Sequence, residues 1–316
     1  MDYQPLLFAL EGSEHLGQAV ADELGIQLAE HELREFEDGE HKARPLQSVR
    51  GRDVYVLHTL FGDEAHNVND KLMQLLFFIG SVKDAGAHRV TALLPYLAYA
   101  RKDRRTKERD PITTRYVAQL LETMGTDCVV ALEVHNRAAF DNAFRCRAVH
   151  LEAHRLFVDA LKEKIGDQPV VVVSPDAGGT KRADRFRDVW TEITGDEPPT
   201  AFMEKHRSKG EVTGDAVVGD MTDRVAIIID DMVSGGTTLL RAVEACRNNG
   251  ATAVYGVITH ALFRPGSEKL YDAEVMDELL ITDSVKPQRE AADTSKVTVI
   301  PVAELFADAI RDLHDG

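Results

Sequence analysis

Short, wholly apolar runs alternate with longer amphipathic segments along nearly the whole chain, and this alternation is the strongest constraint on its fold. The strand-like runs are 54–60, 90–94, 128–134, 170–174, 225–229, 253–259 and 278–282. Several are apolar at every position, as is typical of parallel strands covered on both faces. Alternating strands and helices predict an α/β fold with mostly parallel sheets, in which ligands bind beyond the carboxyl ends of the strands.

Helix signals separate these runs. Asn67 is predicted to cap a helix that ends at Gly86, and further helices are predicted for 113–124 and 238–248. Residues 150–164 show a helical pattern that leads into a new strand, so we place a domain boundary just before residue 150.

This boundary predicts two domains, 1–149 and 150–302, with a last helix (303–316) that packs back on the first domain. A length of 316 residues is enough for two domains of ordinary size, and 44% hydrophobic residues supply a core for each. No apolar run reaches the roughly 18 residues of a membrane span, and the first residues lack the basic segment of a signal peptide. Three widely spaced cysteines indicate buried thiols in a reducing compartment. We therefore predict a soluble, cytoplasmic protein.

The formal net charge of −16 argues against nucleic acid as a partner, because phosphate backbones require a basic face. Against this acidic background one group of cations stands out, formed by Arg101, Lys102, Arg104, Arg105, Lys107 and Arg109. A solvated surface loop is the ordinary explanation for such a run. The alternative is a clamp for polyphosphate, since guanidinium groups bind phosphates through paired hydrogen bonds.

The segment 225–238 is the strongest local signal, because an apolar run is followed by Asp230 and Asp231, a Ser-Gly-Gly-Thr-Thr loop and a helix. Backbone N–H groups of such a loop and of a helix N-terminus bind a phosphate dianion. The two carboxylates can accept hydrogen bonds from neighbouring sugar hydroxyls. An ordinary strand-to-helix turn would explain a bare Gly-Gly-Thr, but two adjacent acids favour a phosphosugar site.

Further motifs occur in order along the chain. They are Phe36-Glu-Asp38-Gly-Glu40, Ser48-Val-Arg50-Gly, Pro95-Tyr-Leu-Ala-Tyr-Ala-Arg101-Lys102-Asp103-Arg104, Glu133-Val-His135, Ser174-Pro-Asp176-Ala-Gly178-Gly179, Lys205-His-Arg207 and Gly219-Asp220. The segment 225–238 resembles the phosphoribosyl-binding signature of type I phosphoribosyltransferase folds, and the whole series resembles the ribose-phosphate pyrophosphokinases. The resemblance implies two tandem domains of type I phosphoribosyltransferase-like fold, each a mostly parallel sheet flanked by helices. It also implies a transferase of nucleotide biosynthesis that moves the β,γ-diphosphate of ATP to the 1-hydroxyl of ribose 5-phosphate, giving phosphoribosyl diphosphate and AMP.

The resemblance assigns ATP to the first domain, where an aromatic ring would stack on adenine and cations would grip the polyphosphate. The implied ATP-binding residues are Phe36, Asp38, Glu40, Arg101, Lys102, Asp103, Arg104 and His135. His135 and Asp176 are the implied ligands of Mg²⁺, which prefers few protein ligands together with phosphate oxygens and water.

Ribose 5-phosphate is assigned to the second domain. The implied binding residues are Asp176, Gly178, Gly179, Asp220, Asp230, Asp231, Ser234, Gly235, Gly236, Thr237 and Thr238. Lys205 and Arg207, in a polar loop suited to closing over substrate, are the implied catalytic residues. They would stabilise the transferring group, so that alignment and charge neutralisation carry the rate.

The phosphate loop departs from the family pattern. Aligned without gaps on the double acid, Gly235 and Thr237 fall where the family has Thr and Gly. A one-residue deletion before Ser234 restores the match, which leaves the individual phosphate donors open. Lys102 also replaces a glutamine, and Glu133 replaces an aspartate.

Self-association and regulation are further expectations. The resemblance implies a homo-oligomer built from dimers, up to a hexamer, and the helix through 72–79 is apolar around much of its circumference. Ser48 and Arg50 match an allosteric phosphate site, but the family's Ser-containing tail does not follow Gly316. We therefore expect weak or no activation by phosphate.

Two other functions compete with synthesis of phosphoribosyl diphosphate. A non-catalytic regulatory homologue would have lost its metal and catalytic-loop residues, but His135, Asp176, Lys205 and Arg207 are all present. A phosphoribosyltransferase would not need a whole extra domain carrying the Phe36–Glu40 and Arg101–Arg104 segments.

Overall fold

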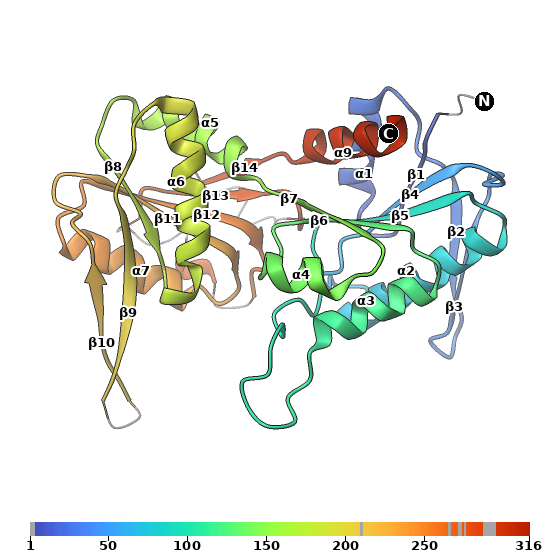
Figure 1. The fold of residues 1–316 in the computed structure, drawn as a ribbon, viewed down its shortest axis with the longest axis horizontal. Helices are drawn as coiled ribbons and strands as arrows, with labels where there is room; N and C mark the ends of the chain where they lie inside the picture. The colour runs from blue at the N-terminus through green and yellow to red at the C-terminus, as the bar shows by residue number, and fades with distance from the viewer. Residues whose placement is uncertain (1–3, 209–210, 265–266, 271–273, 275, 287–294) are drawn as a thin grey trace. The chain divides into compact units, whose positions relative to one another are not determined.

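The computed structural model describes residues 4–208, 211–264, 267–270, 274, 276–286 and 295–316. The chain divides into two compact units, each a sheet flanked by helices (Figure 1). Unit 1 comprises Met1–Glu152 and Pro301–Gly316, and unit 2 comprises Ala153–Ile300. None of the helices among the described residues combines the length and the apolar character needed to cross a membrane.

Unit 1 contains a fully parallel sheet in the order β1-β4-β5-β6-β7 and a separate β2-β3 hairpin. Its elements are β1 (Leu6–Ala9), α1 (Glu14–Leu24), β2 (His31–Glu35), β3 (His41–Pro45), β4 (Asp53–Leu57), α2 (Val68–Asp84), β5 (Arg89–Leu94), α3 (Thr113–Thr123), β6 (Cys128–Leu132), α4 (Arg137–Ala143), β7 (Arg147–Leu151) and α9 (Ala303–Asp315).

Unit 2 contains a seven-stranded sheet in the order β10-β9-β8-β11-β12-β13-β14, parallel except for the β9–β10 pair. Its elements are α5 (His154–Ile165), β8 (Val170–Ser174), η1 (Ala177–Gly179), α6 (Thr180–Thr194), β9 (Thr200–Ser208), β10 (Glu211–Val218), β11 (Val225–Val233), α7 (Thr237–Asn248), β12 (Ala253–Ala261), η2 (Glu268–Leu270), β13 (Glu278–Thr282) and β14 (Val297–Ile300). Two mostly parallel sheets flanked by helices confirm the predicted fold class.

Most of these elements occur where caps and apolar runs in the sequence predict them. The Asn67 side chain accepts hydrogen bonds from the N–H groups of Asn69 and Asp70, and the Asp70 carboxylate accepts one from Asn67 N–H. This reciprocal cap starts α2 where the sequence predicts it. Strands β6 and β8 are buried at every position, as expected of central parallel strands.

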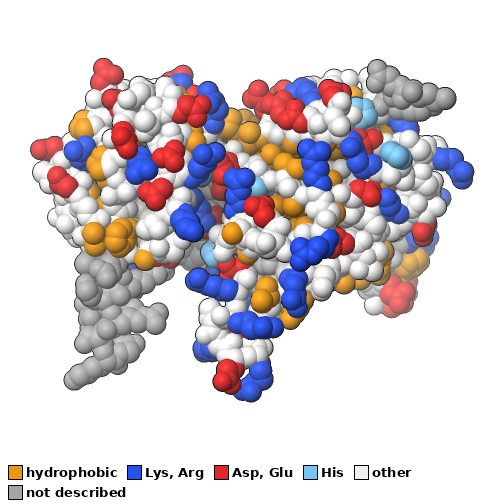
Figure 2. Space-filling model, in the orientation of Figure 1, with side chains coloured by type: hydrophobic (Ala, Val, Ile, Leu, Met, Phe, Trp, Pro, Cys, Tyr) orange, Lys and Arg blue, Asp and Glu red, His pale blue; other side chains and the backbone are white. Residues whose placement is uncertain are grey.

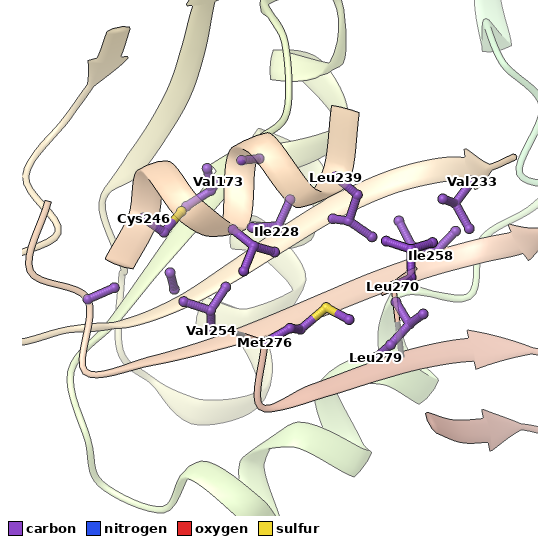
Figure 3. Packing of buried hydrophobic residues seen from close by; sticks show 14 of the residues in the cluster. Val173, Ile228, Val233, Leu239, Cys246, Val254, Ile258, Leu270, Met276 and Leu279 are labelled. Atoms are coloured by element: carbon purple, nitrogen blue, oxygen red, sulfur yellow. The ribbon is translucent and has the colours of Figure 1, made fainter. Parts of the chain in front are cut away.

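The core of unit 2 lies between the sheet and its helices. In the region shown in Figure 3, Leu239 and Cys246 of α7 belong to the same apolar cluster as Ile228 of β11 and Val254 of β12. Burying such side chains contributes about 1.5–3 kcal/mol each and fixes α7 on the sheet. The first turn of α7 is therefore held rigidly beyond the end of β11.

Three sequence expectations are wrong. Residues 147–151 form the half-buried strand β7, and the helix predicted from residue 150 begins only at His154. Strand β11 does not stop at Ile229 but continues through both acids to Val233, because it keeps pairing with β12. Strands β4 and β6 conversely end earlier than predicted, at Leu57 and Leu132.

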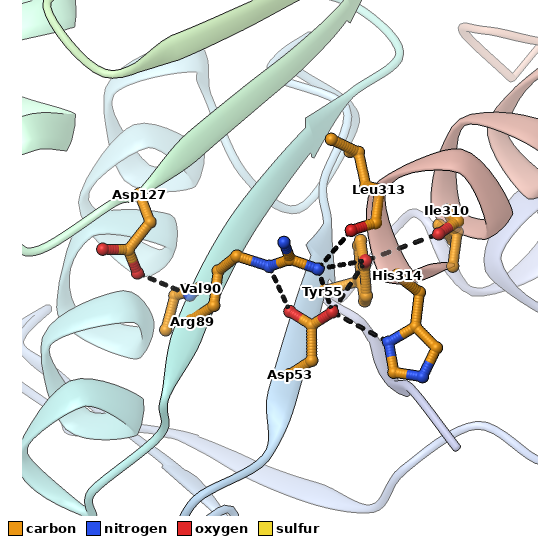
Figure 4. A network of polar contacts seen from close by, with 8 residues as sticks. All are labelled: Asp53, Tyr55, Arg89, Val90, Asp127, Ile310, Leu313 and His314. Atoms are coloured by element: carbon orange, nitrogen blue, oxygen red, sulfur yellow. Dashed lines mark hydrogen bonds and ion pairs between the residues drawn. The ribbon is translucent and has the colours of Figure 1, made fainter. Parts of the chain in front are cut away.

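The last helix, α9, packs on α1 in unit 1. A polar network joins its end to the sheet (Figure 4). The Asp53 carboxylate accepts hydrogen bonds from Arg89 Nε (2.8 Å) and Tyr55 Oη (2.9 Å) and contacts His314 Nδ1 at 2.9 Å. Arg89 also donates to the carbonyl of Leu313. Burial alone would raise the pKa of Asp53, but the hydrogen bonds from Arg89, His314 and Tyr55 together lower it.

Candidate functional site

The loops that follow β8 and β11 meet at one edge of the unit 2 sheet. These strands are parallel neighbours, with Val173 opposite Ile228, so the chain after each emerges at the same edge. Arg182 of α6 joins the two segments, because its guanidinium contacts Asp230 Oδ1 at 2.8 Å and Asp231 Oδ1 at 3.1 Å. The structure thus brings the predicted Asp176–Gly179 loop and the double acid together.

The double acid lies beside the Arg182 guanidinium, and its two carboxyl groups differ in their access to solvent. Asp231 is buried, and Asp230 is partly exposed toward the edge. Burial and the neighbouring charge of Asp231 raise the pKa of Asp230, and the Arg182 guanidinium opposes this shift only in part. A ligand that donates hydrogen bonds, such as a vicinal diol, would stabilise the ionised pair.

The loop after β8 is held by hydrogen bonds to one of its own side chains, Asp176. Asp176 Oδ1 accepts hydrogen bonds from the N–H groups of Gly178 (2.9 Å) and Gly179 (3.0 Å). A Cβ at Gly179 would lie 2.6 Å from Ser174 Oγ, so a side chain would force the loop to shift. Both predicted glycine amides therefore point at Asp176 in this state, and any diphosphate would have to compete with its carboxylate.

The loop after β11 ends in an uncapped helix. Gly236 has φ +76°, and α7 begins at Thr237 without a side-chain cap, so the N–H groups of its first turn remain available to a ligand. A Cβ at Gly236 would lie 2.5 Å from Leu270 Cγ, which shows how closely η2 covers this loop. Thr237 and Thr238 are exposed at the helix start.

Lys269 of η2 completes this arrangement, although no sequence motif pointed to it. Its Nζ donates a hydrogen bond of 2.9 Å to Thr237 Oγ1. An ammonium group thus lies at the first turn of α7, where a phosphate would also meet the helix dipole. The sequence held no signal for this contact, because Lys269 lies 32 residues after Thr237 in the short helix η2.

The structure places Asp220 away from this edge, and it describes only the backbone of Lys205 and Arg207. Asp220 is not at this edge: Val218 pairs with Phe202, which is opposite Ser174, and the chain after Val218 runs back toward the amino ends of the strands. Its assignment to ribose 5-phosphate stays a prediction that this position does not support. Lys205 and Arg207 lie in β9, which continues past Phe202 beyond the end of β8, so their predicted loop is one arm of a hairpin. Their side chains lie outside the described part.

In unit 1 the segments after β5 and β6 also meet at a carboxyl edge. These strands are parallel neighbours, and Asn136 Nδ2 donates a hydrogen bond of 2.6 Å to Asp103 Oδ2. His135, next to Asn136, is exposed. The predicted 101–104 segment and His135 are therefore brought close together.

The cation-rich loop is organised by an acid that sequence analysis missed. Asp110 Oδ2 accepts hydrogen bonds from Lys102 Nζ (2.5 Å), Thr106 Oγ1 (2.8 Å) and the N–H groups of Thr106 and Lys107 (both 3.0 Å). These bonds, led by that of Lys102, hold the pKa of Asp110 below its usual range. Lys102 thus stabilises the loop internally. Of the cations predicted to bind ATP, Arg101 and Arg104 are exposed. Lys and Arg side chains cover much of the projecting loop in Figure 2.

The predicted adenine residues form the tip of the β2–β3 hairpin. Phe36 is 43% exposed with Arg34 Cζ 5.3 Å from its ring centroid, and Asp38 Oδ1 accepts a hydrogen bond from Glu40 N–H (3.1 Å). Within unit 1 this tip lies apart from the cation-rich loop (Figure 1). Ser48 and Arg50 are exposed between β3 and β4.

The described residues contain no cluster of three or more His, Cys, Asp or Glu suited to a metal ion. The predicted donors are instead one exposed imidazole, His135, and one carboxylate, Asp176, whose Oδ1 already accepts two amides. So small a donor set does not suit a resident structural ion. It fits magnesium that arrives with a nucleotide and keeps phosphate and water ligands.

Comparisons with known proteins agree with this layout. A family model for the N-terminal domain of ribose phosphate pyrophosphokinase matches residues 6–125, and one for a phosphoribosyl synthetase-associated domain matches residues 198–316. The chain is 33% identical to ribose-phosphate pyrophosphokinase from Hyphomonas neptunium, over 96% of this chain and 95% of that protein. It is 34% identical to ribose-phosphate pyrophosphokinase A from Dictyostelium discoideum, over 97% and 94%.

A solved structure shares the whole fold. The crystal structure of phosphoribosylpyrophosphate synthetase from Mycobacterium smegmatis matches with a TM-score of 0.88 at 32% identity, covering 99% of both chains. The fold is that of an α/β protein with two units, and acidic and glycine-rich segments lie beyond the carboxyl ends of its parallel strands. The chain belongs to the ribose-phosphate pyrophosphokinase family.

Proposed function

We propose that the protein is an active ribose-phosphate diphosphokinase, with MgATP bound by unit 1 and ribose 5-phosphate by unit 2. The observation that carries the proposal is the edge of unit 2, where the double acid bound by Arg182 adjoins an uncapped helix N-terminus with Lys269 beside it. Carboxylates suit the ribose hydroxyls, and the helix start with an ammonium suits the 5-phosphate.

In the proposed reaction the 1-hydroxyl oxygen of ribose 5-phosphate attacks the β-phosphorus of ATP. A bond forms from that oxygen to the β-phosphorus, the bond from the β-phosphorus to the α,β-bridging oxygen breaks, and AMP leaves while the hydroxyl proton is released. The chain contributes alignment and charge neutralisation. Arg101 and Arg104 would grip the polyphosphate, and Lys205 and Arg207 remain the predicted stabilisers of the transferring group.

Magnesium, when bound with ATP, would neutralise phosphate charge and polarise the transferring group. His135 in unit 1 and Asp176 in unit 2 remain the predicted protein ligands. An exposed imidazole and a carboxylate with one oxygen already engaged offer few donors, which suits an ion that keeps phosphate and water oxygens.

We also propose self-association. Met73 and Phe77, one turn apart on α2, are 39% and 46% exposed, although the helix buries its other large apolar side chains. The hairpin tip with Phe36 lies apart from the cation-rich loop of its own unit. If both contact one ATP, the hairpin must come from a second copy of the chain.

Phosphorus NMR tests the proposed reaction. The protein is incubated with ATP, magnesium and ribose 5-phosphate, and the expected products are AMP and phosphoribosyl diphosphate in equal amounts. Formation of ADP would indicate ordinary phosphoryl transfer and contradict the proposal. Binding of both substrates without turnover would identify the non-catalytic homologue, and ribose in place of ribose 5-phosphate serves as the control substrate.

A further inference from the structure

The turn that carries His135 holds a strained backbone. Strand β6 ends at Leu132, and the next residue, Glu133, is buried with φ +40°. A positive φ is unfavourable for a non-glycine residue, because its Cβ crowds the backbone, so the surroundings must enforce it. The direction in which His135 leaves the sheet therefore depends on what holds this turn.

Strand β7 holds the turn through two consecutive hydrogen bonds. The Glu133 N–H donates to the Leu151 carbonyl (3.0 Å), as a ladder bond of a sheet would. The next donor, Val134 N–H, bonds to a side chain instead: His150 Nε2 accepts it at 3.2 Å. On the other side Asn136 is tied to Asp103, so the turn is fixed at both ends.

The environment of His150 keeps its Nε2 an acceptor. The ring is 5% exposed, with the Phe140 ring centroid 6.3 Å away. An Nε2 that accepts a backbone N–H carries no proton, which assigns the neutral tautomer with the proton on Nδ1. Nδ1 lies 3.8 Å from Glu152 Oε1.

The charged groups around the ring are Glu133, Glu152 and Asp141, opposed by Arg137. Burial lowers the pKa of His150 more than the carboxylates raise it, which favours the accepting form near neutral pH.

We infer that His150 is a positioning residue: it holds the 133–136 turn so that His135 is aimed at the magnesium–phosphate group of bound ATP. This inference rests on the proposed function. The role needs an acceptor at the place of Nε2, which a glutamine can supply through its amide oxygen and a leucine of similar size cannot. His150→Gln and His150→Leu therefore separate the hydrogen bond from mere space filling.

Amide hydrogen exchange of the 133–136 turn gives a readout independent of activity. In His150→Leu the exchange of Val134 N–H should rise about 10-fold, as loss of one hydrogen bond predicts, and His150→Gln should restore the wild-type rate. Phe140→Leu perturbs packing near the ring but keeps the acceptor, so it should leave the rate unchanged. Equal rates in all variants, or a Gln variant as fast as the Leu variant, would overturn the inference.

Calorimetry of MgATP binding connects the turn to the ligand. His150→Leu should weaken binding of MgATP about 10-fold but should have no further effect in a His135→Ala background, because positioning acts only through His135. Without magnesium, which EDTA removes, ATP should bind the wild-type protein and His150→Leu equally. Additive effects of the two substitutions would show that His150 acts elsewhere.

Failure of the inference can be told from failure of the proposed function. A wild-type protein that does not bind MgATP would contradict the proposed function. If Val134 N–H still exchanged faster in His150→Leu than in wild type, His150 would hold the turn, but not for that ligand. If the wild-type protein binds MgATP and turns over, but His150→Leu binds MgATP equally well, only the positioning role would be contradicted.

Discussion

Lys269 lies outside every motif of the sequence, yet its ammonium is placed at the first turn of α7. If the 5-phosphate binds there, Lys269→Gln should raise KM for ribose 5-phosphate about 10-fold, on the order of one charge-assisted hydrogen bond. The kcat and the KM for ATP should change much less. Steady-state kinetics with Lys269→Arg, which keeps the charge, and Lys162→Gln on α5 provide the controls. An unchanged KM would mean that Lys269 only ties η2 to α7.

Asp230 and Arg101 test the assignment of substrates to the two units. Asp230→Asn removes a charged acceptor from the unit 2 edge and should weaken ribose 5-phosphate about 10- to 100-fold while MgATP binds normally. Arg101→Ala should do the reverse, because the exposed cation belongs to the loop of unit 1. Calorimetry with each substrate alone measures both effects. Two substitutions that weaken the same ligand would refute the assignment.

At the scale of elements, the junction of β11 and α7 offers a matched pair of glycines. Gly236→Ala combines a positive φ, which costs roughly 1–2 kcal/mol, with a Cβ only 2.5 Å from Leu270 Cγ. It should shift η2 and raise KM for ribose 5-phosphate about 10-fold or more. Gly235→Ala, whose Cβ would meet no protein atom, should leave η2 in place and raise KM less than Gly236→Ala does. Similar kinetics for both variants would show that this loop does not position the phosphate.

The network that fastens α9 predicts a pH-dependent contribution to stability. Asp53→Asn should lower the free energy of unfolding by about 2 kcal/mol at pH 7, which corresponds to a fall of about 4–8 °C in the unfolding midpoint. Because the folded-state pKa of Asp53 is lowered, its contribution is complete above about pH 4 and fades as the pH falls through the folded-state value. Thermal unfolding at pH 7 and at pH 3 should therefore show a difference that shrinks in acid. Asp308→Asn, which changes an exposed acid on α9, should show no such trend.

At the scale of the whole molecule, the protein should be larger than its 35.0 kDa monomer in light scattering at micromolar concentration. Phe77→Asp should shift it toward the monomer, because it places a charge on the exposed apolar face of α2. Asp84→Asn, a polar change near the end of the same helix, is the control. A wild-type monomer would contradict the proposed self-association.

Mixing experiments test whether one ATP site is built from two copies. Phe36→Ala and Arg101→Ala should each be nearly inactive alone. If their hairpin and loop meet across copies, a mixture regains activity, because some sites then combine an intact hairpin with an intact loop. Activity in the mixture that never exceeds the sum of the two variants would place both residues in a single chain.

Much of the fold could be predicted because its signals are local. Wholly apolar runs mark central strands, and the Asn67 cap starts α2 in the predicted place. The last two residues of strand β7 were assigned to the following helix, because β7 is a half-buried edge strand whose polar residues obscure the alternation. The extension of β11 through its two acids depends on pairing with β12, which no local pattern reports.

The candidate site divides in the same way. Motif residues at the ends of strands could be found, since glycines and acids there have local causes. Arg182, Lys269 and Asp110 could not, because each acts through a tertiary contact or a loop conformation. Asp220 shows the converse case: it belongs to a motif in the sequence, but the antiparallel direction of β10 carries the chain away from the carboxyl edge before Asp220.

Unit 1 is completed by α9, whose residues follow the whole of unit 2 in the chain. On the ribosome, therefore, the first 152 residues emerge long before the helix that covers α1 exists. At about 5–20 residues per second, synthesis of the remaining half takes roughly 10–30 s. During that interval the surface that will receive Phe306, Ile310 and Leu313 stays open to chaperones or to other nascent chains. Unit 2, a single uninterrupted stretch, should reach its native state first, although its sequence is translated second.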